Sequence, residues 1–198
     1  MSKYKLLIFT SNKGKILEIK KLLPKKQINI ITLQDNKKSY KIKEVGKTFK
    51  ENAIIKSMYG FKILQLPCIA EDSGICIDSM NGKPGVESNR YQKKLGGYNR
   101  ANRKIIEITR KKLNFSASFN SVISFTYKKN RTVTFCGSVK GKINNKMVGK
   151  KGFGYDPIFI PNNSFKTFGQ MSKYEKNKFS HRGLAIRNFI KYLEKIIL

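Results

Sequence analysis

The chain has 198 residues but no tryptophan, one histidine, three cysteines and only 12 acidic residues. Cys68, Cys76 and Cys136 lie in apolar stretches without CxxC spacing. Together with a single histidine, His181, this pattern argues against a zinc site. We therefore interpret the cysteines as buried, reduced thiols of an intracellular protein.

Long hydrophobic runs are also missing. No stretch approaches the roughly 20 apolar residues that a membrane-spanning helix needs. The apolar run at Leu6–Phe9 is too short for a signal peptide, and polar residues follow it at once. We expect a cytoplasmic protein with no membrane association. Its length suits one domain, residues 1–198, in one or two lobes.

Acidic residues are outnumbered by 42 basic ones, which gives a formal net charge of +30. Arginine, the residue that nucleic-acid readers favour for bidentate contacts, occurs at only seven positions. The remaining basic residues are lysines spread from end to end, which indicates a compositional bias rather than a built patch. We expect at most non-specific nucleic-acid binding, and an electrostatic attraction for polyanionic substrates.

Hydrophobic periodicity predicts mixed strands and helices. Apolar runs and period-two alternation predict strands at 4–9, 29–33 and 67–70 and a hairpin over 115–135. Spacing of three and four predicts helices from Lys15 to Pro24, over 48–64, over 99–113 and at 186–197. Thr48 and Glu51 form a predicted capping box. Because the hairpin excludes an all-parallel sheet, the fold class is α/β with a mixed sheet.

The most informative local feature is Glu71-Asp72-Ser73-Gly74, placed directly after the predicted strand at 67–70. Carboxylates at a strand end are held rigidly, and two adjacent ones point to different sides. One of them can bind a metal ion while the other polarises a water. Asp-Ser-Gly is also a common turn, so from these residues alone both interpretations stand.

Three further segments carry polar side chains of the kinds that bind nucleotides. A lysine-containing loop at 10–15 precedes a predicted helix and suits a phosphate, although it lacks Walker A spacing. Two glycines bracket Phe153 just before Asp156, and an aromatic placed there can stack on a base. His181 and Arg182 precede the last helix. A polar loop, a β-turn and a structural histidine are the corresponding ordinary interpretations.

The order and spacing of these segments resemble the inosine triphosphate pyrophosphatase family over nearly the whole chain. The matching segments are TSNKGK at 10–15, EVGKTFKENAIIKS at 44–57, AEDSGICID at 70–78, NGKPGVESNRY at 81–91, GKKGFGYDPIFIP at 149–161 and KTFGQMSKYEKNKFSHRGLA at 166–185. The resemblance implies an elongated mixed β-sheet with flanking helices, two lobes around a nucleotide cleft, a homodimer and a Mg²⁺ requirement.

Residue by residue, the resemblance also implies roles. Asp72 would be the metal-associated general base, Lys56 would act on the phosphates, and Glu44 and Glu71 would join Asp72 at the metal. The substrate-binding residues would be Thr10, Ser11, Asn12, Lys13, Gly14, Lys15, Ser73, Phe153, Gly154, Tyr155, Asp156, Lys176, His181 and Arg182.

The implied reaction is hydrolysis of deaminated purine nucleoside triphosphates (ITP, dITP, XTP) to the monophosphate and pyrophosphate. Water attacks the α-phosphorus, and Mg²⁺ and lysines stabilise the developing charge. Donors from His181 and Arg182 would recognise the 6-keto group. Two alternatives are a related pyrophosphatase for modified pyrimidine or ordinary nucleotides, and a basic nucleic-acid-binding protein without catalysis.

Overall fold

The structure is a computed structural model that describes residues 3–33, 35, 40 and 42–196. Two compact units make up the chain. Unit 1 comprises Met1–Asp72, Ser121–Cys136 and Arg182–Leu198, and unit 2 comprises Ser73–Asn120 and Gly137–His181. Ile197, the last member of the predicted helical stripe at 186–197, lies outside the described residues.

Six strands form one mixed sheet in the order β2-β1-β3-β4-β5-β6. Their bounds are β1 Tyr4–Ile8, β2 Ile28–Thr32, β3 Cys68–Ile77, β4 Ser116–Lys128, β5 Arg131–Ile143 and β6 Phe159–Pro161. β1 pairs in parallel with β2 and with β3, whereas β5 and β6 are antiparallel. This confirms the predicted α/β class with a mixed sheet.

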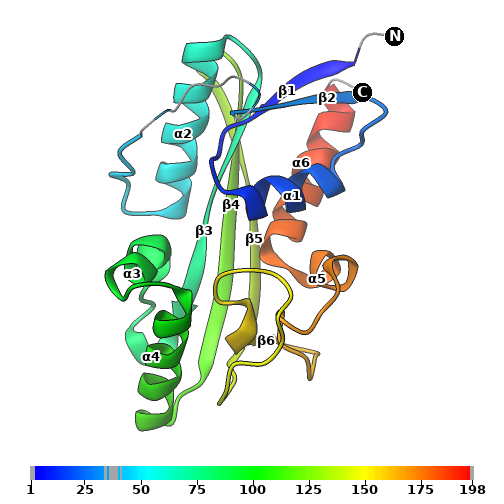
Figure 1. The fold of residues 1–198 in the computed structure, drawn as a ribbon. Helices are drawn as coiled ribbons and strands as arrows, with labels where there is room; N and C mark the ends of the chain where they lie inside the picture. The colour runs from blue at the N-terminus through cyan, green and yellow to red at the C-terminus, as the bar shows by residue number, and fades with distance from the viewer. Residues whose placement is uncertain (1–2, 34, 36–39, 41, 197–198) are drawn as a thin grey trace. The chain divides into compact units, whose positions relative to one another are not determined.

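Over its described residues, unit 1 contains three α-helices: α1 Lys13–Leu22, α2 Phe49–Leu64 and α6 His181–Ile196, whose first residue belongs to unit 2. Residues of β1 and the following Phe9 alternate between two apolar clusters. Leu6 and Ile8 pack with residues of α1 and α6, whereas Leu7 and Phe9 pack with residues of α2. Helices therefore cover both faces of the sheet in unit 1 (Figure 1). A strand buried on both faces explains the continuous apolar run at 6–9.

Unit 2 contains α3 Ser88–Lys94, α4 Tyr98–Lys111 and α5 Lys173–Phe179. Single 3₁₀ turns lie at Asp78–Met80, Gly85–Glu87 and Asp156–Ile158. Its core joins apolar residues of β3, α4, β4 and β5 to Tyr155, Phe159 and Phe168. The short helices α3 and α5 and the strand β6 were not predicted, because none is long enough to show a hydrophobic period.

Most predicted elements are confirmed within one to three residues, including the first strand of the hairpin. The second strand of the hairpin continues to Ile143, beyond the predicted end at 135, and the last helix begins at His181, before the predicted start at 186. The predicted cap of α2 is confirmed in part. The hydroxyl of Thr48 accepts from the backbone N–H of Glu51 at 3.1 Å, but the Glu51 carboxylate accepts from the N–H of Lys47 at 2.6 Å. The side-chain bond of Glu51 thus reaches one residue further back than in a capping box.

The predicted strand end before Glu71 is wrong, because β3 continues through the acidic pair to Ile77. The Asp-Ser-Gly sequence is therefore extended strand and not a turn. Gly74 has a packing role: a Cβ there would lie 2.2 Å from the carbonyl oxygen of Gly85 and 2.4 Å from Oγ of Ser88. Glycine at this position therefore allows the backbone of Gly85 to pack closely against the strand.

The three cysteines are free thiols, but only Cys68 is buried; Cys76 is partly exposed and Cys136 is exposed. The interpretation of all three as buried is therefore wrong, because Cys136 lies on an exposed stretch of β5. Across the described ranges, no helix combines the length and the apolar character that crossing a bilayer requires.

Candidate functional site

Glu71 and Asp72 are adjacent in β3, so their side chains point to opposite faces of the sheet. Both are almost fully buried, at 2% and 6% exposure. Asp72 faces α2, where it contacts Lys56, and Glu71 faces α1 and α6, where it contacts Lys15 and Arg182. The predicted divergence of the two carboxylates is present, and it produces two distinct polar clusters within unit 1.

Around Asp72, the ammonium of Lys56 binds two carboxylates. Its Nζ lies 2.7 Å from Oδ1 of Asp72 and 3.0 Å from Oε1 of Glu44. Lys56 comes from α2 and is 9% exposed, whereas Glu44 precedes that helix and keeps 43% of its side chain exposed. We call Lys56, Glu44 and Asp72 the carboxylate cluster; it is buried at one end and open at the other.

Burial and charge act in opposite directions on this cluster. Burial raises the pKa of Asp72, and the nearby ammonium groups of Lys56 and Lys15 offset this only in part. For Lys56, burial lowers the pKa, but the attraction of Asp72 and Glu44 is stronger and the net shift is upward. A carboxylate held with a raised pKa beside a permanent cation is suited to accept a proton from water.

Sequence analysis missed Asn52, which is fully buried one helical turn before Lys56 on α2. Its amide makes two bonds to the backbone of Gly46: Oδ1 accepts from N–H at 2.9 Å, and Nδ2 donates to the carbonyl oxygen at 3.2 Å. Nδ2 also lies 3.5 Å from Oδ2 of Asp72. Asn52 thus connects the segment that carries Glu44 to Asp72. The i,i+4 spacing from Lys56 was the available signal.

On the opposite face of β3, three residues hold the carboxylate of Glu71. Its Oε1 accepts from Ser121 at 2.7 Å and from Arg182 at 3.0 Å, and its Oε2 lies 3.1 Å from Nζ of Lys15. Arg182 also pairs with Glu18 of α1. Glu18 and Ser121 were not predicted, although Glu18 is one of the few acidic residues and lies three positions after Lys15.

Burial and the ion pairs shift the pKa values of the basic groups in this second cluster. Arg182 is 2% exposed, and despite burial the carboxylates of Glu71 and Glu18 raise the pKa of its guanidinium. Burial lowers the pKa of Lys15 against the attraction of Glu71. The structure therefore places Arg182, predicted as a base-reading residue, inside an ion-pair network that links β3, α1 and α6.

The predicted phosphate loop at 10–15 contains the start of α1. Asn12 caps the helix, since its Oδ1 accepts from the backbone N–H of Lys15 at 3.1 Å, and the N–H of Asn12 donates to the hydroxyl of Thr10 at 3.2 Å. Ser11 and Lys13 are exposed and Gly14 is partly exposed. The loop thus presents a helix N-terminus, exposed polar groups and the Lys15 ammonium, which suit an anion.

Unit 2 holds the predicted base-recognition residues. Asp156 and Lys176 are 2% and 4% exposed, and their side chains pair at 2.7 Å. Oδ2 of Asp156 also accepts from the backbone N–H of Phe153 at 2.7 Å, and the Lys176 ammonium lies 4.9 Å from the centre of the Phe153 ring. The structure thus brings these three residues together within unit 2.

The other predicted residues of unit 2 have structural contacts of their own. The hydroxyl of Tyr155 donates to the carbonyl oxygen of Ser88 at 2.7 Å. His181 is 3% exposed and stacks on Phe119, with ring centres 4.6 Å apart and an angle of 6° between the planes. Ser73 follows Asp72 in β3 and is partly exposed.

The carboxylate cluster supplies oxygen ligands of the kind that Mg²⁺ prefers, since this ion is typically held by one or two carboxylates with substrate phosphates completing its shell. The oxygens of Glu44 and Asp72 that converge do so on Nζ of Lys56, which occupies that point in this structure. Within the described ranges, no three His, Cys, Asp or Glu side chains group as metal ligands. Glu71, the third predicted ligand, faces the other side of β3 and binds Lys15 and Arg182.

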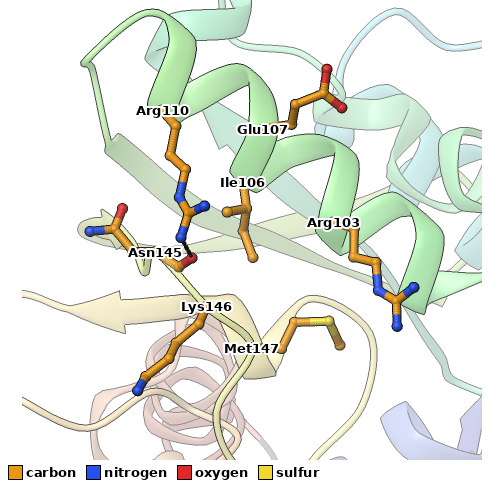
Figure 2. Close-up of a pocket in the computed structure, with 7 residues that line it drawn as sticks. All are labelled: Arg103, Ile106, Glu107, Arg110, Asn145, Lys146 and Met147. Atoms are coloured by element: carbon orange, nitrogen blue, oxygen red, sulfur yellow. Dashed lines mark hydrogen bonds between the residues drawn. The ribbon is translucent and has the colours of Figure 1, made fainter.

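A separate pocket of about 550 Å³ lies in unit 2, between α4 and the segment 145–147 (Figure 2). Arg110 closes one end, since its guanidinium donates to the carbonyl oxygen of Asn145 at 2.6 Å. Arg103 and Lys146 extend outwards in different directions (Figure 2). The lining residues include no member of the predicted site, so the pocket is not the candidate site.

The chain is similar in sequence to one family of known proteins. The model of the Ham1 family matches residues 6–192. The chain is 43% identical to a dITP/XTP pyrophosphatase of Borrelia duttonii, over 97% of this chain and 98% of that protein. It is 39% identical to a dITP/XTP pyrophosphatase of Christiangramia forsetii, over 96% and 100% of the two chains.

Solved structures of Ham1 proteins have the same fold as this chain. A Ham1 protein of Coxiella burnetii superposes with a TM-score of 0.85 at 34% identity and covers 97% of this chain and 99% of its own. The Ham1 protein of Staphylococcus aureus gives a TM-score of 0.84 at 35% identity, with 96% and 98% covered. The similarity therefore extends over nearly the whole length of each chain.

Proposed function

This chain belongs to the Ham1 family, and from that premise we propose that it hydrolyses deaminated purine nucleoside triphosphates (ITP, dITP, XTP) to the nucleoside monophosphate and pyrophosphate. A relative named dITP/XTP pyrophosphatase is 43% identical over nearly the full chain. The observation that carries the proposal is the carboxylate cluster, in which Lys56 binds Asp72 at 2.7 Å and Glu44 at 3.0 Å.

In this proposal, Asp72 is the general base. Its buried carboxylate orients the attacking water and accepts a proton as the water oxygen bonds to the α-phosphorus and the bond to the pyrophosphate oxygen breaks. Lys56 holds Asp72 in place and lowers the repulsion between two carboxylates and an anionic substrate. Asn52 holds the segment that carries Glu44 in position through its two hydrogen bonds to the backbone of Gly46.

Glu44 and Asp72 are the residues that would hold Mg²⁺, since each is a carboxylate that uses one oxygen to bind Lys56 and the side chain of Glu44 is 43% exposed. When bound, this ion neutralises charge on the phosphates and lowers the pKa of water. Glu71, which the sequence analysis also assigned to the metal, takes a supporting role. It binds Lys15, the last residue of the phosphate loop at 10–15, and it binds Arg182.

Base recognition is assigned to residues of unit 2 together with Arg182. The partly exposed ring of Phe153 stacks on the purine, and its position depends on Asp156 and Lys176. The 6-keto oxygen of hypoxanthine or xanthine accepts hydrogen bonds from His181 and Arg182, whereas the 6-amino group of adenine leaves these donors unpaired. Arg182 would exchange a carboxylate partner for the base on substrate binding.

A homodimer, a cytoplasmic location and the two-lobed nucleotide cleft complete the proposal, and they rest on the family resemblance. Size-exclusion chromatography with light scattering tests the first. A mass near twice the 22.7 kDa of one chain supports a dimer, and a mass of one chain excludes it.

The site of water attack gives the sharpest test of the reaction. Turnover of XTP in ¹⁸O-labelled water, followed by mass spectrometry of both products, locates the new oxygen. We expect the label in the nucleoside monophosphate and not in pyrophosphate, because attack occurs at the α-phosphorus. Label in pyrophosphate would show attack at the β-phosphorus, and release of inorganic phosphate with a diphosphate would overturn the proposed reaction.

A further inference from the structure

The loop Gly152–Asp156, which carries Phe153, is held by one hydrogen bond within it and by hydrogen bonds to α3 and α4. Gly152 and Gly154 bracket the ring with left-handed φ angles of 76° and 71°. On one side, Asp156 accepts from the N–H of Phe153, and on the other the hydroxyl of Tyr155 donates to Ser88 of α3. A third bond comes from α4, where Nδ2 of Asn102 donates to the carbonyl oxygen of Gly154 at 3.1 Å.

Asn102 is an unusual residue for its place. It is 1% exposed, and its helix neighbours Ala101 and Ile105 belong to the apolar core of unit 2. Its Nδ2 reaches the Gly154 carbonyl, but among the described residues its Oδ1 is buried without a hydrogen-bond partner. A buried amide oxygen without a partner destabilises the folded chain, whereas an apolar side chain of similar size would not.

Because the unpaired Oδ1 destabilises the fold, the stability of unit 2 alone does not account for an asparagine at position 102. Gly154 is partly exposed, so water can satisfy its carbonyl if the amide is removed. The folded core would then gain from an apolar residue, while the loop would lose its bond to α4. Polar groups retained at a cost to stability are typical of residues that set the geometry of a site.

We propose that Asn102 is a positioning residue for base recognition: its bond to the Gly154 carbonyl fixes the loop and thereby the direction in which the Phe153 ring faces. This inference rests on the proposed function, in which that ring stacks on the purine. Asn102 itself touches no substrate atom and acts only through the loop.

The first experiment compares Asn102→Leu with Thr109→Val. Thr109 is a matched control, because it is fully buried on the same helix and its hydroxyl bonds only within α4, to the carbonyl of Ile106 at 3.0 Å. For Asn102→Leu we expect the KM for XTP to rise roughly three- to tenfold, the loss of about one hydrogen bond, with kcat within about twofold of wild type. Its urea midpoint should be no lower than that of wild type.

Asn102→Asp is the second variant, since it keeps the shape of the side chain but cannot donate to a carbonyl. It should raise KM in the same way. The inference is wrong if KM is unchanged in both Asn102 variants, or if Thr109→Val raises it as much. A lower urea midpoint of Asn102→Leu with an unchanged KM would assign Asn102 a purely structural role.

A readout independent of turnover separates this inference from the proposed function. Because the chain has no tryptophan, Phe153→Trp introduces a single tryptophan reporter into the loop, whose fluorescence is excited selectively over that of the nine tyrosines. In that background Asn102→Leu should raise acrylamide quenching of the reporter at least about twofold, and Thr109→Val should not, since only the former frees the loop. Equal quenching would overturn the positioning role. A wild type that cleaves no purine nucleotide would instead refute the proposed function, and the quenching result would still stand.

Discussion

Nζ of Lys56 lies 2.7 Å from Oδ1 of Asp72, and both groups are almost fully buried. Burial raises the pKa of Asp72, and the ammonium opposes that rise. Lys56 therefore sets the proton affinity of the proposed base as well as its position. In a chain with only 12 acidic residues, a buried carboxylate with a single cation so close is a strong sign of function.

Lys56→Met tests this electrostatic relationship. Without the ammonium, the pKa of Asp72 should rise further above its ordinary value, because burial then acts with less opposition. NMR titration of the Asp72 carboxyl in the presence of EDTA measures it directly. Since the base must be deprotonated, the acid limb of kcat/KM should move to higher pH in the variant. Lys50→Met, an exposed change on the same helix, should shift neither. An unchanged or lower pKa in Lys56→Met would contradict the account.

Asn52→Ala should weaken the cation site. Asn52 holds Gly46 through two hydrogen bonds, so its loss frees the segment that carries Glu44. Residues that orient metal ligands typically contribute about 10- to 100-fold to affinity. Calorimetric titration with Mn²⁺ measures the effect, and Asn188→Ala is the control because that amide is exposed and bonds to the Cys136 carbonyl. Equal Mn²⁺ affinity in the two variants would remove Asn52 from the site.

Glu71 and Arg182 should be strongly coupled in stability. Breaking a buried ion pair by removing one partner costs about 3–5 kcal/mol. We expect losses of this size for Glu71→Gln and for Arg182→Leu, and a double variant that loses clearly less than both together. Urea unfolding of the four proteins gives the coupling. The exposed Lys104–Glu107 pair provides the contrast, and Glu107→Gln should leave the midpoint nearly unchanged. Simple additivity of the Glu71 and Arg182 effects would refute the network.

Gly152→Ala tests the loop that carries Phe153. A Cβ at Gly152 would lie 2.1 Å from Oδ2 of Asp156, the atom that holds the Phe153 N–H. Gly82→Ala is a matched control, because its φ of 77° equals that of Gly152 within one degree but nothing lies within 4 Å of its Cβ. Both variants should lose some stability, and only Gly152→Ala should raise the KM for XTP. A similar KM in the two would show that the loop geometry does not matter.

The sequence was most informative where physical constraints are local. Strand alternation and helical spacing predicted the main elements, and Thr48 was identified as the cap of α2 because capping depends on neighbouring residues. The adjacent carboxylates Glu71 and Asp72 were expected to diverge, and β3 makes them diverge. The prediction failed at the end of that strand. Gly74 resembles a turn residue in the sequence. In the structure a side chain there would collide with the backbone of Gly85, a contact that the sequence does not reveal.

Long-range pairings could not be predicted. Arg182 binds Glu18 and Glu71, which precede it by more than 100 positions. No local sequence pattern predicts these two contacts. Asn102 is a similar case, because its partner Gly154 is 52 positions away and a buried amide is informative only when its partner is known. The family resemblance supplied candidate roles for Asp72 and Lys56, and the structure supplied the geometry that makes those roles chemically reasonable.

The most direct test of the account is pyrophosphate release from XTP, dITP, ITP, ATP and GTP by the wild type and by Asp72→Asn, each with Mg²⁺ and with EDTA. We expect the wild type to cleave XTP, dITP and ITP far faster than ATP and GTP, and to lose activity with EDTA. Asp72→Asn should be slower by about 10²- to 10⁴-fold, the usual contribution of a general base. A folded wild type that releases pyrophosphate from none of them, or an Asp72→Asn variant with full activity, would contradict the central claim.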